Sequence, residues 1–414
     1  MNGNKWGSLV CLIEVCICLV LIVEAQGTGG TSSGAVGARL TERSRTGVGR
    51  ELDDYKIVFP TSYDGKIRRT YSTYEAIIHS QRQNFVTEMN RLGSLGYRMK
   101  FSATSDLPMS IVASDEGKFE YDWFETKSNL FFAKNRLDQN LDAFAMKGFY
   151  LADHIFIGAA CDAPYPPDPV PIEKCVYTDF FIVEKGPQKV KKPNQIIVSS
   201  PPGWKARPSE DLATAINEKV SEGYYPVRAI SKFEIVLEKG INSDDVIKEK
   251  PQFQVVRTGL GAGDIKKKVN ELAGQGFRLL LVDNGIAILY RKIGTLSAPA
   301  SYMWVDARKK NFEKEIAKLE QTGARYCVAY PNAQGVKDSL IFETLSKSAI
   351  AKEFRILRFE FDFKEDQAAN KVDVDLTAAS KDVVKQMNAL AKEGFVVQDL
   401  FQSDKISVIL ERSR

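Results

Sequence analysis

Apolar residues from position 55 onward change from helical to strand spacing six times along the chain. Each change occurs at a glycine that follows an amphipathic stretch, and in five cases an aromatic residue comes next. The six pairs are Gly96-Tyr97, Gly148-Phe149, Gly223-Tyr224, Gly276-Phe277, Gly323-Ala324 and Gly394-Phe395. A recurrence of this kind indicates tandem copies of one small structural unit.

The residues eleven, seven and four positions before each glycine share an apolar character. Steps of four and three residues place side chains on one stripe of an α-helix, so the pattern predicts a helix before every glycine. Lys219 is the one exception among the eighteen positions, and we expect the neighbouring Val220 to take its place. The apolar members are Phe85, Leu137, Leu212, Ile265, Phe312, Val383, Met89, Leu141, Ile216, Val269, Ile316, Met387, Leu92, Phe144, Leu272, Leu319 and Leu390.

The ends of the predicted helices carry residues suited to helix termini. Twelve positions before the glycine, five of the six repeats have Asn or Asp, at Asn84, Asp211, Asp264, Asn311 and Asp382. Such side chains cap exposed amides or oppose the positive end of the helix dipole. The glycine itself fits the left-handed residue that ends many helices.

Strand-like alternation follows each glycine and predicts a hairpin, with Asp283-Asn-Gly285 as the tightest turn. One further strand is expected before each helix, at Tyr55–Phe59, Phe119–Phe124, Gln195–Val198, Phe253–Val256, Tyr302–Val305 and Phe354–Phe363. The fold class is therefore α+β, with about six tandem β-α-β-β repeats. Each repeat is predicted to form an antiparallel sheet covered by one helix.

The composition places the repeat boundaries where Gly, Pro and Lys gather. We expect the repeats at 51–118, 119–190, 191–250, 251–297, 298–350 and 351–414, the second with a proline-rich insertion bracketed by cysteines. A unit of this size makes a marginal core on its own, so neighbours should pack on one another. The pattern leaves an elongated array and a closed ring equally open.

The helix ends resemble those of a small bacterial family known as a domain of unknown function, built from the same strand-helix-hairpin unit. Its hallmark is a helix ending in Leu-Gly/Ala-x-Glu/Gln-Gly before an aromatic residue. The segments 270–277 and 388–395 match it best, and 90–97 less closely. The family often has Glu after the aromatic residue, whereas this chain has Arg98, Tyr150, Tyr225, Arg278, Arg325 and Val396. The resemblance implies the fold and no active site.

The first 25 residues predict a secretory signal peptide. Lys5 precedes an apolar run from Leu9 to Val23, and small residues precede a cleavage site after Ala25. An uncleaved anchor is the alternative, but the run is shorter than a bilayer span and Glu14 interrupts it, so we expect cleavage and no integral membrane span afterwards. Residues 26–50 are rich in Gly, Ser and Thr and predict a flexible tether. The protein is thus expected to be exported, either periplasmic or secreted.

Charge and histidine content restrict the function further. The 57 basic and 53 acidic residues nearly balance, which is unlike the one-sided basic surface of a nucleic-acid-binding protein. The chain has 2 histidines, His79 and His154, and no zinc-type spacing joins either to a cysteine. We therefore predict no catalytic, cofactor-binding or metal-binding residues and no cofactor.

Two motifs have a simpler structural interpretation than a chemical one. Gly259-Leu-Gly-Ala-Gly263 has its third glycine misplaced for a dinucleotide site, and we interpret it as a strand-to-helix turn. Glu360 and Asp362 alternate with phenylalanines, which is typical of a sheet with one wet face.

The mature chain retains Cys161, Cys175 and Cys327. Cys161 and Cys175 bracket the proline-rich loop and are the candidate disulfide, which would stabilise the chain by roughly 3 kcal/mol; two buried free thiols are the alternative. Asp153, His154 and Tyr165 flank or lie in this insertion and are the candidate binding face, because insertions in repeat proteins often bind partners.

The sequence favours a non-catalytic binding or scaffold protein of the cell envelope whose partner is an envelope protein or a glycan. The alternative is an envelope hydrolase or glycan-processing enzyme that uses carboxylates. An enzyme should gather polar residues of several repeats into one pocket with perturbed acidity, whereas a binding protein should present an open groove or sheet edge.

Overall fold

The computed structural model describes twenty stretches of the chain. These are residues 54–58, 67–70, 74–103, 109–115, 117–128, 134–161, 175–187, 194–200, 208–231, 233–239, 243–257, 262–283, 285–292, 300–331, 337–345, 352–359, 363–366, 371–374, 376–402 and 405–413.

The six predicted repeats form six units, each with one three-stranded antiparallel sheet and one main helix. Units 1 to 3 contain β1 (Tyr55–Val58), α3 (Tyr74–Ser94), β3 (Tyr97–Ala103) and β4 (Met109–Ser114); β5 (Glu120–Ser128), α4 (Lys134–Met146), β6 (Tyr150–Cys161) and β7 (Cys175–Lys185); and β8 (Asn194–Ser199), α5 (Pro208–Val220), β9 (Tyr225–Ser231) and β10 (Glu234–Lys239). Units 4 to 6 contain β11 (Gln252–Arg257), α7 (Ala262–Gly274), β12 (Arg278–Asp283) and β13 (Ile286–Arg291); β14 (Ala300–Asp306), α8 (Phe312–Gln321), β15 (Arg325–Pro331) and β16 (Lys337–Leu345); and β17 (Lys352–Arg358), α9 (Leu376–Lys392), β20 (Val396–Gln402) and β21 (Ile406–Ser413).

Strand order is the same in all six units, with the last strand in the centre between the first and the second. This confirms the predicted strand-helix-hairpin unit. In unit 4, Asp283 lies opposite Ile286 and Gly285 has φ 72°, so the predicted two-residue hairpin turn is present.

The predicted apolar stripe is buried along the helices. Val269 and Met387 are 0% exposed, and Val220 is buried as expected beside Lys219. All six helix-ending glycines have positive φ, between 66° and 89°. A residue with a β-carbon would be strained there, which explains why the helices end at glycine.

Helix starts differ from the prediction. Helices α3 and α9 begin well before Asn84 and Asp382, so these residues lie inside helices and cap nothing. Asn311 does occupy the cap of α8, but its side chain makes no capping bond and donates to Glu315 instead. A further short helix that the pattern did not predict, α6 (Ser243–Glu249), precedes unit 4.

The strand predicted at Phe354–Phe363 is also interrupted. Strand β17 ends at Arg358, and Phe359 bonds through its amide to Ile406 while its side chain is 0% exposed in the core. The chain then enters a separate hairpin, β18 (Phe363–Asp366) and β19 (Lys371–Val374). Phe359 thus packs in the core shared by units 6 and 1, directly after the last residue of β17.

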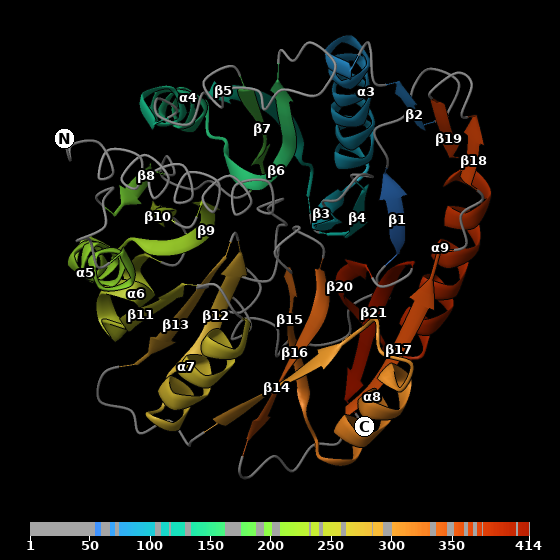
Figure 1. Cartoon of the computed structure of the whole chain (residues 1–414). Helices are drawn as coiled ribbons and strands as arrows, with labels where there is room; N and C mark the ends of the chain where they lie inside the picture. Colours follow the sequence, from blue (N-terminus) through green and yellow to red (C-terminus); the bar gives the residue numbers. More distant parts are fainter. Residues whose placement is uncertain are drawn as a thin grey trace, which may run out of the picture.

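The six units close into a ring (Figure 1). The main helix of every unit contacts the first strand of the following unit, and α9 of unit 6 contacts β1 of unit 1. Each of the six hydrophobic core clusters joins two successive units; the cluster with Tyr55 and Ile111 of unit 1 also holds Val383 and Met387 of unit 6. Because the cores lie between units, no unit buries its apolar surface alone. The ring alternative is the correct one.

At four of these joints, the asparagine six residues before the helix-ending glycine connects its unit to the next one. Its side chain accepts the amide and donates to the carbonyl of one first-strand residue in the next unit. Asn270, for example, accepts from Tyr302 N at 2.7 Å and donates to Tyr302 O at 3.1 Å. The other pairs are Asn90 with Tyr121, Asn217 with Phe253 and Asn388 with Tyr55. Between units 5 and 6, Glu320 accepts the amide of Phe354 instead, at 2.7 Å.

The second strand of every unit has a β-bulge at the same place, four residues after the glycine. The register shifts at Lys100, Ala152, Val227, Leu280, Cys327 and Gln398. A bulge disrupts the ladder locally and releases backbone groups. In five units the amide of the preceding residue donates to a side chain of the next unit: Met99 to Tyr121, Leu151 to Gln195, Leu279 to Tyr302, Tyr326 to Glu411 and Val397 to Tyr55.

The joint between units 3 and 4 departs from this pattern on both sides. Pro226 stands at the donor position and has no amide hydrogen, and Phe253 of the next unit has no hydroxyl to accept one. Neither group is therefore left without a partner, and Asn217 still holds both backbone groups of Phe253.

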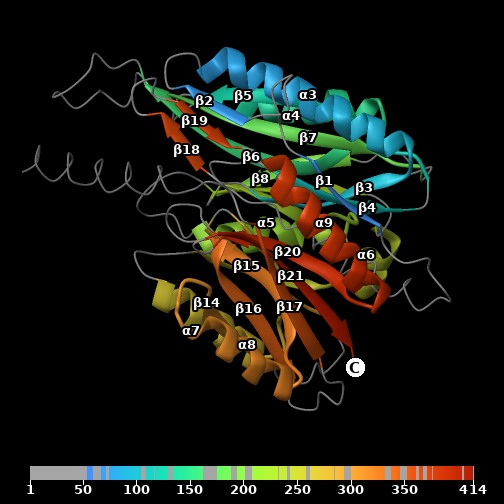
Figure 2. The same cartoon turned by 90° about the vertical axis from the view of Figure 1, so that its right-hand side faces the viewer.

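A seventh sheet crosses the joint between units 6 and 1. Its order is β18-β19-β2, where β2 (Ile67–Thr70) comes from unit 1. Strand β19 pairs antiparallel with β2, with Val372 opposite Arg69. Figure 2 shows this sheet at the side of the ring opposite the C-terminus.

Candidate functional site

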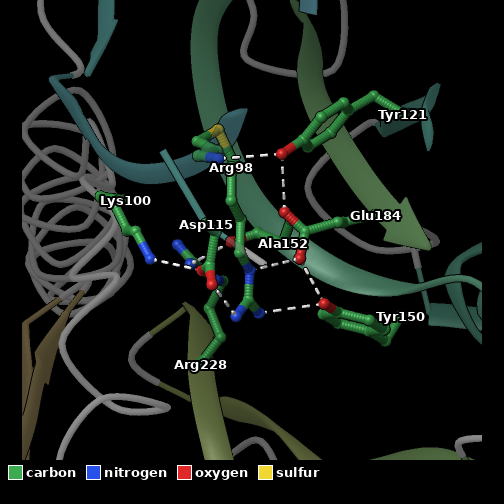
Figure 3. Close-up of polar contacts among 9 residues, drawn as sticks. Arg98, Lys100, Asp115, Tyr121, Tyr150, Ala152, Glu184 and Arg228 are labelled. Atoms are coloured by element: carbon green, nitrogen blue, oxygen red, sulfur yellow. Dashed lines mark hydrogen bonds and ion pairs between the residues drawn. The ribbon is translucent and has the colours of Figure 1, made fainter. Parts of the chain in front are cut away.

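A group of polar side chains from units 1, 2 and 3 lies around the second strands of these units (Figure 3). We call its larger part the Arg98 cluster, formed by Arg98, Lys100, Asp115, Tyr121, Tyr150 and Glu184. Arg98 comes from the strand β3 of unit 1, whereas Tyr121, Tyr150 and Glu184 come from the three strands of unit 2.

Glu184 is the centre of this cluster and is 2% exposed. Its Oε1 accepts Arg98 Nε at 2.8 Å and the Tyr150 hydroxyl, and its Oε2 accepts the Tyr121 hydroxyl at 2.8 Å. Arg98 also donates to the Tyr150 hydroxyl at 3.0 Å. On the outer side, Lys100 pairs with Asp115 at 2.7 Å. Both carboxylate oxygens of Glu184 thus accept hydrogen bonds, and the three donors come from units 1 and 2.

The environment perturbs the acidity of these groups. Burial, followed by the charge of Glu184, raises the pKa of Tyr121 and of Tyr150 well above the ordinary value. For Arg98, burial opposes the charge, but Glu184, Tyr150 and Asp115 together raise its pKa above the usual value. The tyrosines therefore remain protonated donors, and the arginine remains charged.

Next to it lies the Arg228 cluster, formed by Arg228, Asp153 and Asp283 from the second strands of units 3, 2 and 4. Arg228 Nη1 lies 2.7 Å from Asp153 Oδ1 and 3.9 Å from Asp283 Oδ2, and Nη2 donates to Ala152 O at 2.9 Å. The side chains of Arg228 and Asp153 are 5% and 1% exposed. One guanidinium therefore contacts second strands of both neighbouring units.

Glu238 of unit 3 completes the group. It accepts Gln195 Nε2 at 2.7 Å and the Tyr225 hydroxyl at 3.3 Å, while Gln195 Oε1 accepts the amide of Leu151 in unit 2. Burial raises the pKa of Glu238 above its ordinary value, although the bonds from Gln195 and Tyr225 and the charge of Arg98 oppose the shift. Glu238 thus binds a proton more readily than an exposed carboxyl does.

These contacts indicate the chemistry of the site. Charge-assisted hydrogen bonds between units are strong and fix the geometry of both partners. Hydroxyls with raised pKa values give up their protons less readily, and Glu184 already accepts three hydrogen bonds. The two clusters thus connect units 1 to 4 of the ring.

Two of the predicted binding-face residues lie in this region. Asp153 and His154 are 1% and 2% exposed. Asp153 accepts from Arg228, and the His154 ring stacks on Phe181 with centroids 4.6 Å apart. Because both side chains are buried, neither lies on an exposed binding surface as the sequence had suggested. Tyr165 lies outside the described residues.

The candidate disulfide residues are adjacent in the sheet. Cys161 ends β6, Cys175 begins β7, and the two are direct cross-strand partners. Opposite residues in antiparallel strands have Cα atoms about 4.5–5.5 Å apart, within the span that a disulfide requires. The register is therefore compatible with the bond, which remains a prediction. Cys327 is a buried free thiol.

Several other expected features fall outside the described residues. They are the signal peptide, the tether, Glu360 and Asp362. Among the described residues, no group of three or more His, Cys, Asp or Glu side chains could hold a metal ion. None of the helices described here has the length and apolar character to cross a membrane.

The residues that make the joints are not among those predicted from the sequence. The asparagine at the same helix position in four repeats was a detectable signal. The positions after the aromatic residues, such as Arg98 and Arg278, were noted only as departures from a family pattern, yet both pair with a glutamate of the next unit. The glutamates had no local signal, because the register alone brings them to these arginines.

Comparisons of the chain with family models, curated proteins and solved structures found no match. The resemblance to the bacterial family of unknown function therefore remains a prediction.

Proposed function

We propose that the protein is an exported, non-catalytic binding or scaffold protein of the cell envelope. Its ring holds an envelope protein or glycan on the face where the unit hairpins turn. We call this the hairpin face. The carrying observation is that the main departures from the repeat occur on this face.

The register locates each departure. In unit 1, the extra segment begins after Val58, which pairs with Ser110 near the hairpin turn. In unit 6 it begins after Arg358, which pairs with Ser407, again near the turn. The unit 2 insertion lies at the hairpin turn itself, between Cys161 and Cys175. The segments that interrupt the repeats of units 6, 1 and 2 thus begin at strand ends on one face, the face on which Figure 2 shows β18, β19 and β2.

This arrangement is typical of repeat proteins that bind partners. Repeats supply a rigid framework, and insertions in particular repeats map to loops on one face, which is often the binding face. The unit 2 hairpin strands, β6 (12 residues) and β7 (11 residues), are also the longest of the described strands. Their last and first residues, Cys161 and Cys175, are the ends between which the insertion lies in the sequence.

Cross-linking in the native envelope tests this proposal, followed by affinity capture and mass spectrometry. Replacement of residues 162–174 by a Gly-Ser segment, with both cysteines kept, should abolish the capture of one dominant partner. The matched control is the double variant Leu95→Ala and Met146→Ala. These side chains are 61% and 67% exposed and lie at the ends of α3 and α4 that are away from the hairpin face. Capture that survives the loop replacement but fails in this control would contradict the proposal.

One observation favours the alternative, a glycan-processing enzyme. Polar residues of several units do converge, and Glu238, with its raised pKa, lies in the electrostatic field of Glu184. A carboxyl group with a raised pKa can serve as the general acid in glycoside hydrolysis when a second carboxylate is present. This alternative requires release of sugar from envelope polysaccharide by the parent and its loss in Glu238→Gln. Equal release by both proteins would remove Glu238 from consideration.

A further inference from the structure

The joint between units 6 and 1 differs from the other five in its covalent connection. Successive units are joined by short segments, as between Ser114 and Glu120 or between Leu345 and Lys352. Unit 6 ends at Ser413 and unit 1 begins at Tyr55, so no connection of this kind joins them. The closing joint has only non-covalent contacts to hold it.

The local contacts at this joint are of the same type as elsewhere. Asn388 binds both backbone groups of Tyr55, and the Tyr55 hydroxyl accepts the amide of Val397 at 3.2 Å. Units 4 and 5 share the same pattern through Asn270, Tyr302 and Leu279. The closing joint therefore has no stronger version of the ordinary contacts.

What it has in addition is the seventh sheet. Strand β2 leaves unit 1 between its first strand and its helix, and the β18–β19 hairpin leaves unit 6 at the equivalent point. Strand β19 pairs with β2 over four residues, from Lys371 opposite Thr70 to Val374 opposite Ile67. No other joint within the described residues is crossed by a ladder of backbone hydrogen bonds.

We propose that this sheet is a strap that replaces the missing covalent connection and controls opening of the ring between units 6 and 1. The physical reason is chain entropy. Bringing together the two ends of a long chain costs more than closing a short connector, and the local concentration of one end near the other falls by roughly a hundredfold or more. Added pairing between units 6 and 1 offsets this difference at the one joint that needs it.

A circular permutation separates this role from general stabilisation. The permuted chain begins at Lys352, passes from Arg414 into Asp54 through a copy of the natural connector 346–351, and ends at Leu345. Units 6 and 1 are then covalently joined, and the open joint lies between units 5 and 6. The strap is present in both chain orders, but only the native order needs it to hold the ends.

Val372→Pro weakens the strap in each order, because Val372 lies in the central strand, opposite Glu365 on one side and Arg69 on the other, and proline has no amide hydrogen and disrupts a central strand. Val372→Ala, which retains the amide, is the matched control. Opening is measured as hydrogen exchange of the β1 amides, Tyr55–Val58, by mass spectrometry. In the native order we expect Val372→Pro to accelerate exchange by about tenfold or more, and in the permuted order by less than about twofold.

Equal acceleration in the two orders, or none in the native order, would overturn the proposal. A Val372→Pro chain that folds only in the permuted order would support it, because the strap would then be needed only where the covalent connection is missing. Failure to fold in both orders would count against it. Replacement of 360–375 by the unit 4 connector 258–261 gives a second variant with the same expected contrast.

Discussion

Asn388 and Tyr55 are 333 residues apart in sequence, yet the Asn388 side chain binds both backbone groups of Tyr55, accepting its amide at 2.7 Å and donating to its carbonyl at 3.2 Å. The pair joins the last helix of the ring to its first strand. The same arrangement recurs at three other joints, so its energetic role can be compared within one molecule.

Asn388→Ala should destabilise the protein by about 1–3 kcal/mol, because a part-buried amide and carbonyl of Tyr55 lose their partners. The measurement is urea unfolding followed by circular dichroism. The control is Gln386→Ala on the same helix, whose side chain bonds only to Asp382 at an exposed site and should shift stability by less than about 0.5 kcal/mol. Equal effects of both substitutions would show that the bridge to Tyr55 adds nothing to the joint.

Pro226 and Phe253 should be energetically coupled. Phe253→Tyr alone places a buried hydroxyl opposite a residue with no amide hydrogen and should cost about 1–2 kcal/mol. Pro226→Ala restores the amide, so the double variant should be more stable than the sum of the single changes by about 1 kcal/mol. The measurement is a double-mutant cycle in urea. Strict additivity would mean that the bulge amide does not meet the hydroxyl at this joint.

Val269→Ala and Ile316→Ala should each destabilise the protein by about 2–3 kcal/mol, as truncation of a buried side chain does. Val269 is 0% and Ile316 is 5% exposed, and both lie in cores shared with the next unit. Lys267→Ala, at a side chain 79% exposed on the same helix as Val269, serves as the control in urea melts. Parent-like stability of both core variants would contradict the equivalence of the six helices.

Glu238 should make stability dependent on pH. Its pKa is raised in the folded state, so the folded protein holds this proton more tightly than the unfolded chain. The stabilisation is present below the unfolded pKa and is lost as pH rises through the folded pKa. The Glu238→Gln variant lacks this titration, so its stability relative to the parent should improve as pH rises above about 4. Urea melts at several pH values test this, and a difference that does not change with pH would contradict it.

The candidate disulfide is tested by intact mass after alkylation in denaturant. If Cys161 and Cys175 are bonded, the unreduced mature protein should take one label, at Cys327, and three after reduction. Three labels before reduction would exclude the bond. Reduction of the bonded protein should lower its stability by roughly 3 kcal/mol in the chain-entropy model.

Local physics explains which features the sequence predicted well. The helix stripe that includes Val269, the glycines with positive φ and the Asn-Gly hairpin depend on residues close in sequence. Helix starts were predicted poorly, because α3 and α9 extend past Asn84 and Asp382. Asp153 and His154 were expected at a surface, but packing against Arg228 and Phe181 buries them.

The sequence by itself determined the repeat unit, because helical and strand periodicities, glycine stops and tight turns are properties of short segments. It left the array and the ring equally open. Only the tertiary structure decided for the ring, through contacts such as Asn388 with Tyr55 and the pairing of β19 with β2. These contacts join residues far apart in the chain, and their energy depends on register and on the relative placement of units, which no local pattern specifies.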